Sequence, residues 1–387
     1  FLNPILINNY HFELYSSAST LPQNWDELAK SNIFLSEKYI EILEVSKPEN
    51  MQCFYIGIFE KEELIGIAIA QYLNLNQLPT FTTQDGCLKS SIKRFLFQHF
   101  SSQVLFIGNN MLTGQNAFSF KSNIDKKTTL HSLQLAALEI KRKLKLQGNK
   151  THIITFKDFE TNSLSDFETT NFQKNYRFST QPNMVFDIAE HWKSEQDYID
   201  ALSKKYRDQY KRARKKLGGI EKRKMNLDDI LKHEQKIYAL YLHVAQNAPF
   251  NTFYLAKNHF SVFKEKLGHD FLFYGYFLNN ELVGFNTLIK NGLVLDTYFL
   301  GYDSTIQQQK MLYLNMLYDM IAYAINKGFK KIIFARTALE IKSSVGAKPT
   351  EMYGFMDHQI KFLNTQMHFF FDYFEPKTQW NERNPFK

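Results

Sequence analysis

The chain has 387 residues, of which 44% are hydrophobic and 22% charged, and this composition excludes disordered, collagen-like and coiled-coil proteins. Its length predicts two domains, and its two cysteines exclude both a disulfide framework and a thiolate-rich metal site. Apolar runs such as 65–70 are far shorter than the roughly 20 residues of a membrane span. Because residues 1–10 also lack the basic segment of an export signal, we expect a cytoplasmic protein.

The chain repeats one order of elements. Residues 55–68 (YIGIFEKEELIGIA) and 273–286 (FYGYFLNNELVGFN) match at a constant offset of 218, and each predicts a β-hairpin around a polar turn. Each hairpin is followed by a strand, by a helix that ends at a glycine, and by a β-branched strand, which together predict a parallel crossover. The expected strands, helices and second strands are 104–108, 130–146 and 153–156 in the first copy, and 293–301, 311–326 and 331–334 in the second.

The two copies differ in length. The first contains an insertion at 76–102, with a short helix expected around 91–100, and further strands are expected to close the copies at 183–188 and 351–358. Helices are expected at 227–246 and 253–267, at the front of the second copy. We therefore predict an N-terminal domain of residues 1–188 and a C-terminal domain of residues 189–387. Both are of the α/β (α+β) class, each a mixed, mostly antiparallel sheet flanked by helices.

The positive charge of the chain is concentrated in one segment. The chain as a whole has a net charge of +8, whereas residues 203–224 alone carry a net charge of +9. Most of these cations lie on the predicted basic helix 203–216. The pattern indicates a single contact zone for an anionic partner, with a solvated helix face as the alternative.

This order of elements resembles the GNAT acyltransferase fold, and two such units with a basic helix opening the second resemble the FemAB-like peptidyltransferases and the BioF-like acetyltransferase group. The resemblance rests on residues 202–220, 273–303 and 336–352. It implies acyl transfer to a primary amine with no covalent enzyme intermediate. In this fold the strand before the crossover helix offers a backbone donor to the acyl carbonyl, and the helix N-terminus faces a pyrophosphate.

The sequence departs from that pattern at the helix entry. Enzymes of this fold that use coenzyme A have a glycine-rich turn there, whereas residues 304–310 (STIQQQK) contain no glycine. The donor is therefore either an acyl-CoA such as acetyl-CoA, held by side chains, or another activated carboxyl group, carried by an acyl carrier protein or, as in the Fem proteins, by a tRNA. The tRNA or carrier protein would contact Lys204, Lys205, Arg207, Arg212 and Arg214.

The resemblance and strand-end positions together suggest site residues. Asp296 is the candidate general base, and Tyr298 or Tyr313 the candidate proton donor. Arg336 and Thr337 directly follow a parallel strand, where α/β sheets place ligands. The predicted cofactor-binding residues are Phe299, Leu300, Gln307, Gln309, Lys310, Arg336, Thr337 and Lys342.

The sequence contains no motif of the common metal-dependent, hydrolytic or nucleotide-dependent enzymes. The chain has no HExxH metal motif, no GxSxG nucleophile turn, no phosphate-binding loop and no dinucleotide fingerprint. We therefore predict an acyltransferase that uses no metal. Two alternatives stay open: a Fem-like aminoacyl-tRNA-dependent peptidyltransferase, and a non-catalytic nucleic-acid-binding protein that uses residues 203–224.

Overall fold

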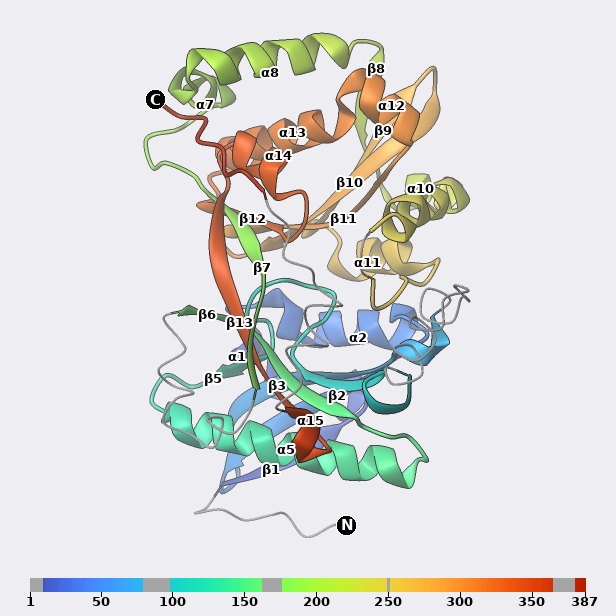
Figure 1. Ribbon diagram of the computed structural model, residues 1–387, viewed down its shortest axis with the longest axis vertical. Coiled ribbons are helices and arrows are strands. Elements are labelled where there is room, and N and C mark those ends of the chain that lie inside the picture. Colours follow the sequence, from blue (N-terminus) through green and yellow to red (C-terminus); the bar gives the residue numbers. More distant parts are fainter. Residues whose placement is uncertain (1–9, 79–97, 162–175, 249–250, 365–379) are drawn as a thin grey trace. The chain divides into compact units, whose positions relative to one another are not determined.

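The computed structural model describes residues 10–78, 98–161, 176–248, 251–364 and 380–387. The chain forms two compact units (Figure 1). Unit 1 consists of residues 1–180, 252–256 and 351–377, and unit 2 of residues 181–251, 257–350 and 378–387. The helix expected around 91–100 lies largely outside the described residues. Among those that are described, no helix is long and apolar enough to span a membrane.

Unit 1 is built on a sheet in which all neighbouring strands are antiparallel except β4 and β6. The strands β2 and β3 form the predicted hairpin, and α5 (Lys126–Leu146) connects β4 to β6 as the predicted parallel crossover. The strand order is β1 (Tyr10–Tyr15), β2 (Met51–Glu60), β3 (Glu63–Asn74), β4 (Gln103–Ile107), β6 (Ile153–Glu160) and β13 (Lys348–His358), with β5 (Phe118–Phe120) beside β3.

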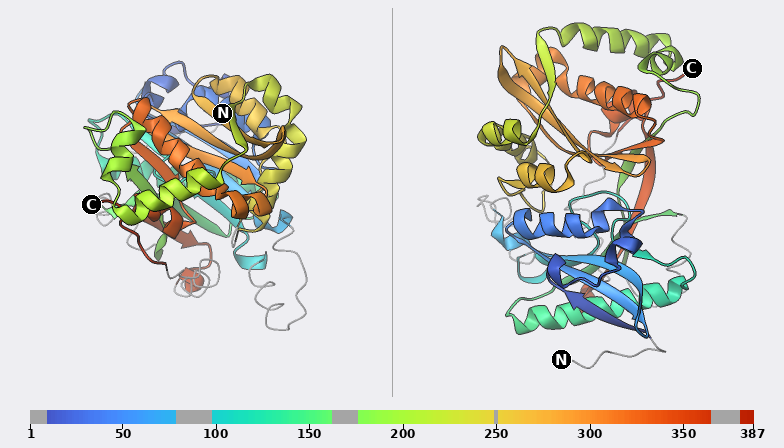
Figure 2. Two further views of the ribbon diagram at one scale, coloured as in Figure 1. Left: turned by 90° about the horizontal axis from the view of Figure 1, so that it is seen from above. Right: turned by 180° about the vertical axis from the view of Figure 1, so that it is seen from behind.

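Helices cover both faces of this sheet (Figures 1 and 2). The apolar side of α5 packs Leu133, Ala137 and Ile140 against the strands, because leucines and alanines recur there at three- and four-residue spacing. The opposite face carries α2 (Glu37–Ser46), whose N-terminus is capped by the Ser36 hydroxyl. The remaining short helices are η1 (Ala18–Thr20), α1 (Trp25–Ala29), η2 (Ile33–Leu35), η3 (Leu75–Gln77) and α15 (Lys361–Asn364).

Unit 2 repeats this plan. Its strands β9 and β10 form the second predicted hairpin, and α12 and α13 connect β11 to the parallel strand β12. The strand order is β7 (Tyr176–Asp187), β12 (Lys331–Ala335), β11 (Val294–Tyr302), β10 (Glu281–Asn291), β9 (Phe271–Leu278) and β8 (Ile220–Lys224). The helices are α7 (Glu195–Ala201), α8 (Lys204–Lys216), α9 (Leu227–Lys232), α10 (Glu234–Gln246), α11 (His259–Leu267), α12 (Ser304–Lys310), α13 (Leu312–Asn326) and α14 (Leu339–Ser344).

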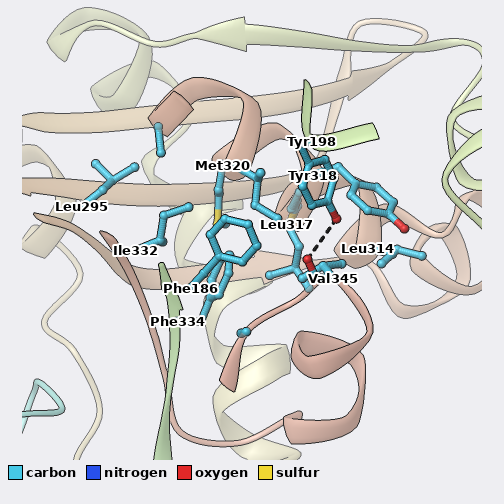
Figure 3. Packing of buried hydrophobic residues seen from close by; sticks show 14 of the residues in the cluster. Phe186, Tyr198, Leu295, Leu314, Leu317, Tyr318, Met320, Ile332, Phe334 and Val345 are labelled. Atoms are coloured by element: carbon cyan, nitrogen blue, oxygen red, sulfur yellow. Dashed lines mark hydrogen bonds between the residues drawn. The ribbon is translucent and has the colours of Figure 1, made fainter. Parts of the chain in front are cut away.

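The main core of unit 2 lies between α13 and the sheet (Figure 3). Met320 and Leu317 of α13 pack with Leu295 of β11, Ile332 of β12 and Phe186 of β7. A buried tyrosine, Tyr198 of α7, donates a hydrogen bond from its hydroxyl to the Val345 carbonyl oxygen at 3.0 Å. The helices α10 and α11 lie on the other face, where the tight approach of α10 requires Gly301: a Cβ atom there would lie 2.6 Å from the backbone of α10.

The two sequence copies exchange their last strands. The strand β7, which ends the first copy, pairs with β12 of the second copy through Met184 to Asp187. The strand β13, which ends the second copy, pairs with β6 of the first copy through Met352 to His358. The compact units therefore differ from the predicted division into 1–188 and 189–387, because a repeat in the sequence fixes the order of elements but not which copy's sheet each strand joins.

Two predicted helices also differ in extent. The expected helix 227–246 is broken at His233 into α9 and α10, and the expected helix 253–267 begins only at His259. The predicted fold class is confirmed, since each unit is a mixed, mostly antiparallel sheet with helices on its faces.

Candidate functional site

The parallel strands β11 and β12 of unit 2 separate at a defined point. Their pairing runs from Val294 opposite Lys331 to Asp296 opposite Ile333 and goes no further. The hydroxyl of Thr297 then donates a hydrogen bond to the Ile333 carbonyl oxygen at 2.9 Å. Beyond this point the two strands diverge. We call the opening between β11 and the segment after β12 the parting, and we call these two segments its arms.

A β-bulge shapes the β11 arm of the parting. The pairs Asn286–Leu300 and Leu288–Thr297 enclose one residue on β10 but two, Tyr298 and Phe299, on β11. The hydroxyl of Thr287 donates to the Phe299 carbonyl oxygen at 2.6 Å and fixes this irregular backbone. A bulge bends a strand and redirects its side chains, and bulges are common beside active sites.

Asp296 is buried at the base of the parting. Its neighbour Leu295 packs in the α13 core, so strand alternation directs Asp296 to the face that carries α11. Its Oδ2 atom has no hydrogen-bond partner within the described part of the chain. Burial raises the pKa of Asp296 to about 7, although a hydrogen bond from Asn291 opposes that increase. A carboxyl group with such a pKa exchanges a proton near neutral pH.

Tyr298 lies two residues further along β11, on the face of Asp296, and pairs with a histidine. The Nε2 atom of His259 lies 3.0 Å from the Tyr298 hydroxyl oxygen, and the two rings stack with centroids 5.8 Å apart. Phe263 covers the same tyrosine at a centroid distance of 5.0 Å. His259 is not among the residues predicted from the sequence, because an isolated histidine at a helix start belongs to no motif.

The β12 arm is a turn with unusual backbone geometry. Ala335, Thr337 and Ala338 have φ angles of 58°, 66° and 47°, which non-glycine residues seldom adopt. The ammonium of Lys342 donates hydrogen bonds to the carbonyl oxygens of Ala335 and Arg336, at 3.2 and 2.6 Å. Such strained segments persist only where surrounding contacts hold them, and they cluster at functional sites.

The buried position of Lys342 changes its acidity. Burial lowers the pKa of its ammonium group to about 7. The two carbonyl contacts assign this side chain to the support of the turn that carries Arg336, which is half-buried, and Thr337, which is exposed. A direct contact of Lys342 with a cofactor stays a prediction.

The predicted pyrophosphate region has an unexpected form. The short helix α12 is capped by Asp303, whose carboxylate accepts hydrogen bonds from the N–H groups of Thr305 and Ile306. Gln307 is half-buried and Gln309 exposed on this helix, while the ammonium of Lys310 donates to the Gly218 carbonyl oxygen at 2.8 Å. The carboxylate of Asp303 thus takes the place that an anionic ligand would have at the α12 N-terminus.

The remaining predicted residues lie beside α13. Met311, with a φ of 51°, separates α12 from α13, so the crossover has two helices. Tyr313 follows this break, half-buried, with its ring centroid 6.2 Å from that of Tyr302. Burial, and the nearby Tyr302, raise the pKa of Tyr313. Leu300, half-buried, lies opposite Asn286. The structure thus brings Asp296 and Tyr298 to one face and places Tyr313 on the side of α13.

The basic helix α8 has two distinct sides. Its exposed cations are Lys204, Lys205, Lys211, Arg212, Lys215 and Lys216, and Arg207 is half-buried. Arg214 instead faces the body of unit 2, where its guanidinium contacts Glu195 at 2.8 Å and Asp319 at 2.7 Å. It also lies over the ring of Tyr210. Arg214 therefore has a structural role in unit 2, and its contact with a partner stays a prediction.

In unit 1, a network of buried side chains lies at the corresponding parallel strands, β4 and β6. The ammonium of Lys157, on β6, donates to the carbonyl oxygens of Asn109 and Leu112 at 3.0 Å each and pairs with Asp158 at 2.6 Å. Because Lys157 and Asp158 are buried, this network ties β6 to the segment that follows β4. The described residues of either unit contain no group of three or more His, Cys, Asp or Glu side chains placed to hold a metal ion.

Comparisons with known proteins give the fold and no sequence family. The sequence matches no protein-family model and no curated protein. Among solved structures, FemX is similar with a TM-score of 0.54 and 13% identity over 92% of this chain and 99% of that one. A tandem GNAT protein from the clavulanic acid biosynthesis pathway has a TM-score of 0.51 and 10% identity, covering 90% of this chain and 98% of that one.

A protein of unknown function from Bacteroides thetaiotaomicron is similar to the same degree, with a TM-score of 0.51 and 12% identity over 89% of this chain and 98% of that one. The chain therefore has the tandem GNAT-like fold that FemX and the tandem GNAT protein share, as the order of its sequence elements predicted.

Proposed function

We propose that the chain is an N-acyltransferase that works at the parting of β11 and β12 in unit 2. It transfers an acyl group from an activated donor, an acyl-CoA or an acyl carrier protein, to a primary amine. The observation that carries this proposal is the position of Asp296, buried where the two strands separate, with a pKa raised to about 7.

The reaction needs an amine without its extra proton. An alkylammonium ion at neutral pH cannot attack a carbonyl carbon, so a group must accept one of its protons. Asp296 meets this need, because a base whose pKa lies near the working pH is both available and strong enough. Its Oδ2, without a hydrogen-bond partner in the described chain, is the atom that receives the proton.

The departing thiolate or alkoxide needs a proton in return. The Tyr298 hydroxyl lies on the same face as Asp296 and is held by His259 at 3.0 Å, so we assign it the role of proton donor. The bulged backbone of Tyr298 and Phe299 supplies the donor that stabilises the negative charge on the acyl oxygen. Arg336 and Thr337 of the β12 arm bind the donor's anionic portion, on a turn fixed by Lys342.

Coenzyme A does not fit the α12 N-terminus well. No glycine enters this helix, and the Asp303 carboxylate already occupies its first N–H groups. A pyrophosphate would meet the negative charge of Asp303 there. This observation favours a donor without a pyrophosphate at that point.

The second candidate function is therefore a Fem-like aminoacyl transfer in which the donor is an aminoacyl-tRNA. The exposed cations of α8, among them Lys204, Lys205 and Arg212, give such a donor a contact surface. A protein that only binds nucleic acid would use the same surface without the parting.

Thermal unfolding with separate donors distinguishes these functions. Acetyl-CoA, coenzyme A, a long-chain acyl-CoA and bulk tRNA are each added to the protein, and a ligand at 100 times its Kd adds about 2.7 kcal/mol. A shift with an acyl-CoA that is reduced in Arg336→Ala supports thioester chemistry at the parting. A shift with tRNA alone moves the assignment to aminoacyl transfer or RNA binding.

Turnover then decides between an enzyme and a binding protein. The release of acyl groups from the donor that binds is followed with a panel of primary amines, in the wild type and in Asp296→Asn. The proposal requires amine-dependent release that falls at least about 100-fold in the variant. Binding without any release, with every amine tried, contradicts it.

A further inference from the structure

A cavity of about 430 Å³ lies in unit 1, at the end of the sheet where β4 begins. This volume is in the range of small-molecule sites. The described residues that line it come from η3, from positions 98–99, from the start of β4 and from the segment that follows α5. They are Asn76, Gln98, His99, Gln103, Gly148, Asn149, Lys150 and His152.

His152 is the chemically informative residue of this cavity. It is only 1% exposed, and the backbone N–H of Gln103 donates to its Nδ1 atom at 3.3 Å. In the neutral ring the proton therefore lies on Nε2. That Nε2 atom has no hydrogen-bond partner among the described residues, although a buried donor left unsatisfied is costly. The cavity thus offers a fixed N–H donor.

Asn76 supplies a complementary acceptor. Its Nδ2 donates to the Gln98 carbonyl oxygen at 3.3 Å, which fixes the orientation of the amide. The Oδ1 atom is buried and has no partner within the described residues. A ligand that satisfies both groups presents an acceptor to His152 and a donor to Asn76.

The basic side chains of the cavity indicate the charge of its ligand. Its described lining contains the ammonium group of Lys150 and the imidazole rings of His99 and His152, and no carboxylate. Burial first, and then His358, Lys150 and His99, lower the pKa of His152 to about 4. Three carbonyl oxygens at the C-terminus of α5, those of Lys143, Leu144 and Lys145, accept hydrogen bonds from the N–H groups that end and follow the helix. An anion is therefore the ligand that this excess of basic groups favours.

We propose that this cavity is a binding site for a small, hydroxyl-bearing oxyanion of the phosphate class, either inorganic phosphate or the phosphate group of a small polyol. The oxyanion accepts the hydrogen bond from His152 and lies against Lys150 and His99 at the mouth. A hydroxyl group of the ligand donates to Asn76. The site is independent of the acyl-transfer proposal, because all of its residues belong to unit 1.

Calorimetric titration at constant ionic strength tests this site on the full chain. The probes are inorganic phosphate, glycerol 3-phosphate and glycerol. The variant Lys150→Gln/His99→Gln removes two exposed groups without disturbing the core, and Lys145→Gln, on the exposed part of α5, is the control for loss of charge. We expect saturable binding of a phosphate that is at least about tenfold weaker in the double variant and unchanged in the control.

The imidazole resonances of His152 provide the second readout. Phosphate binding is expected to shift its Nε2 signal saturably, with the same affinity as the titration. Tighter binding of glycerol 3-phosphate than of inorganic phosphate assigns the site to a phosphorylated polyol, and the reverse order assigns it to the free anion. The absence of saturable binding of either phosphate, or equal affinities in both variants, overturns the proposal.

Discussion

Asp296 and Ile333 form the last pair that joins β11 to β12, and the carboxyl group of Asp296 is buried there. A strand pair that ends at a buried acid combines two features that a folded protein usually avoids: an interrupted ladder and an unsatisfied carboxyl oxygen. In the proposed reaction both have a use, since the interrupted ladder admits the acyl group and the acid accepts a proton.

The first prediction concerns the pH dependence of stability. Because the pKa of Asp296 is raised from 3.8 to about 7, the folded state retains its proton where the unfolded chain has lost it. The contribution of this group to stability is complete below pH 4 and is lost as the pH rises through about 7. We predict that Asp296→Asn increases the free energy of unfolding, relative to the wild type, by a few kcal/mol more at pH 8 than at pH 4. Urea unfolding at both pH values measures this, and a constant difference between variant and wild type contradicts the assigned pKa.

The second prediction concerns the pair of Tyr298 and His259. Their hydrogen bond is expected to give a coupling free energy of about 1 kcal/mol in a double-mutant cycle with Tyr298→Phe and His259→Gln. The control cycle combines Tyr298→Phe with Arg212→Ala on α8, and its effects should add. Additive effects in the first cycle as well would remove His259 from the proposed site.

The third prediction separates the two sides of α8. Arg214 contacts Glu195 and Asp319, so Arg214→Ala removes the guanidinium from two partly buried carboxylates. Asp319 keeps contacts with Lys222 and Tyr276, and Glu195 keeps the hydrogen bond from Tyr210. We expect the free energy of unfolding to fall by about 2 kcal/mol, a value reduced for partial exposure. The neighbouring Arg212→Ala should change it by less than about 0.5 kcal/mol. If RNA binds, we expect the opposite order for affinity: Arg212→Ala weakens RNA binding and lowers its salt dependence more than Arg214→Ala does. Equal effects of the two substitutions on the free energy of unfolding would contradict the structural role of Arg214.

The fourth prediction follows from the contact of β11 with α10. A Cβ atom at Gly301 would lie 2.6 Å from backbone atoms of Leu240 and Tyr241, which cannot move independently of the helix. We expect Gly301→Ala to lower the free energy of unfolding by about 2 kcal/mol or more. The exposed Gly218→Ala, whose Cβ would lie 3.3 Å from one carbonyl oxygen, serves as the control. Similar denaturation midpoints for the two variants would show that α10 packs less closely than described.

The fifth prediction tests the exchanged strands. A fragment of residues 1–188 contains β6 but lacks β13, its partner from Met352 to His358. We expect this fragment to unfold without cooperativity or to aggregate, because the edge of β6 is then unpaired. Co-expression with residues 189–387 should restore a complex that unfolds cooperatively. A fragment that unfolds cooperatively by itself contradicts the need for the exchange.

The sequence predicted what depends on local periodicity. The Glu-Leu-[Ile/Val]-Gly hairpins, the crossover helices and the strands after Gly148 and Gly328 follow from alternation, three- and four-residue spacing and helix-ending glycines. Arg336 and Thr337 were placed at a strand end for the same reason, and their role there stays a prediction.

The sequence could not predict what depends on contacts distant along the chain. The exchange of β7 and β13 joins residues more than a hundred positions apart, and no local pattern distinguishes it from pairing within each copy. The bulge at Tyr298 and Phe299 needs the register with β10. In the sequence Arg214 cannot be distinguished from the other cations of the basic helix, because its contacts with Glu195 and Asp319 depend on the tertiary structure. The break between α12 and α13 occurs at Met311, where no glycine or proline marks the end of a helix in the sequence.

Hydrogen–deuterium exchange with a bound donor tests the location of the site most directly. The protein is compared with and without whichever donor stabilises it, and exchange is followed in peptides that cover residues 294–302 and 331–344 of unit 2 and residues 103–112 and 153–160 of unit 1. The account predicts that the donor slows exchange in both arms of the parting in unit 2 and leaves the matching segments of unit 1 unchanged. Protection confined to unit 1, or to α8 without the parting, would contradict acyl transfer at Asp296.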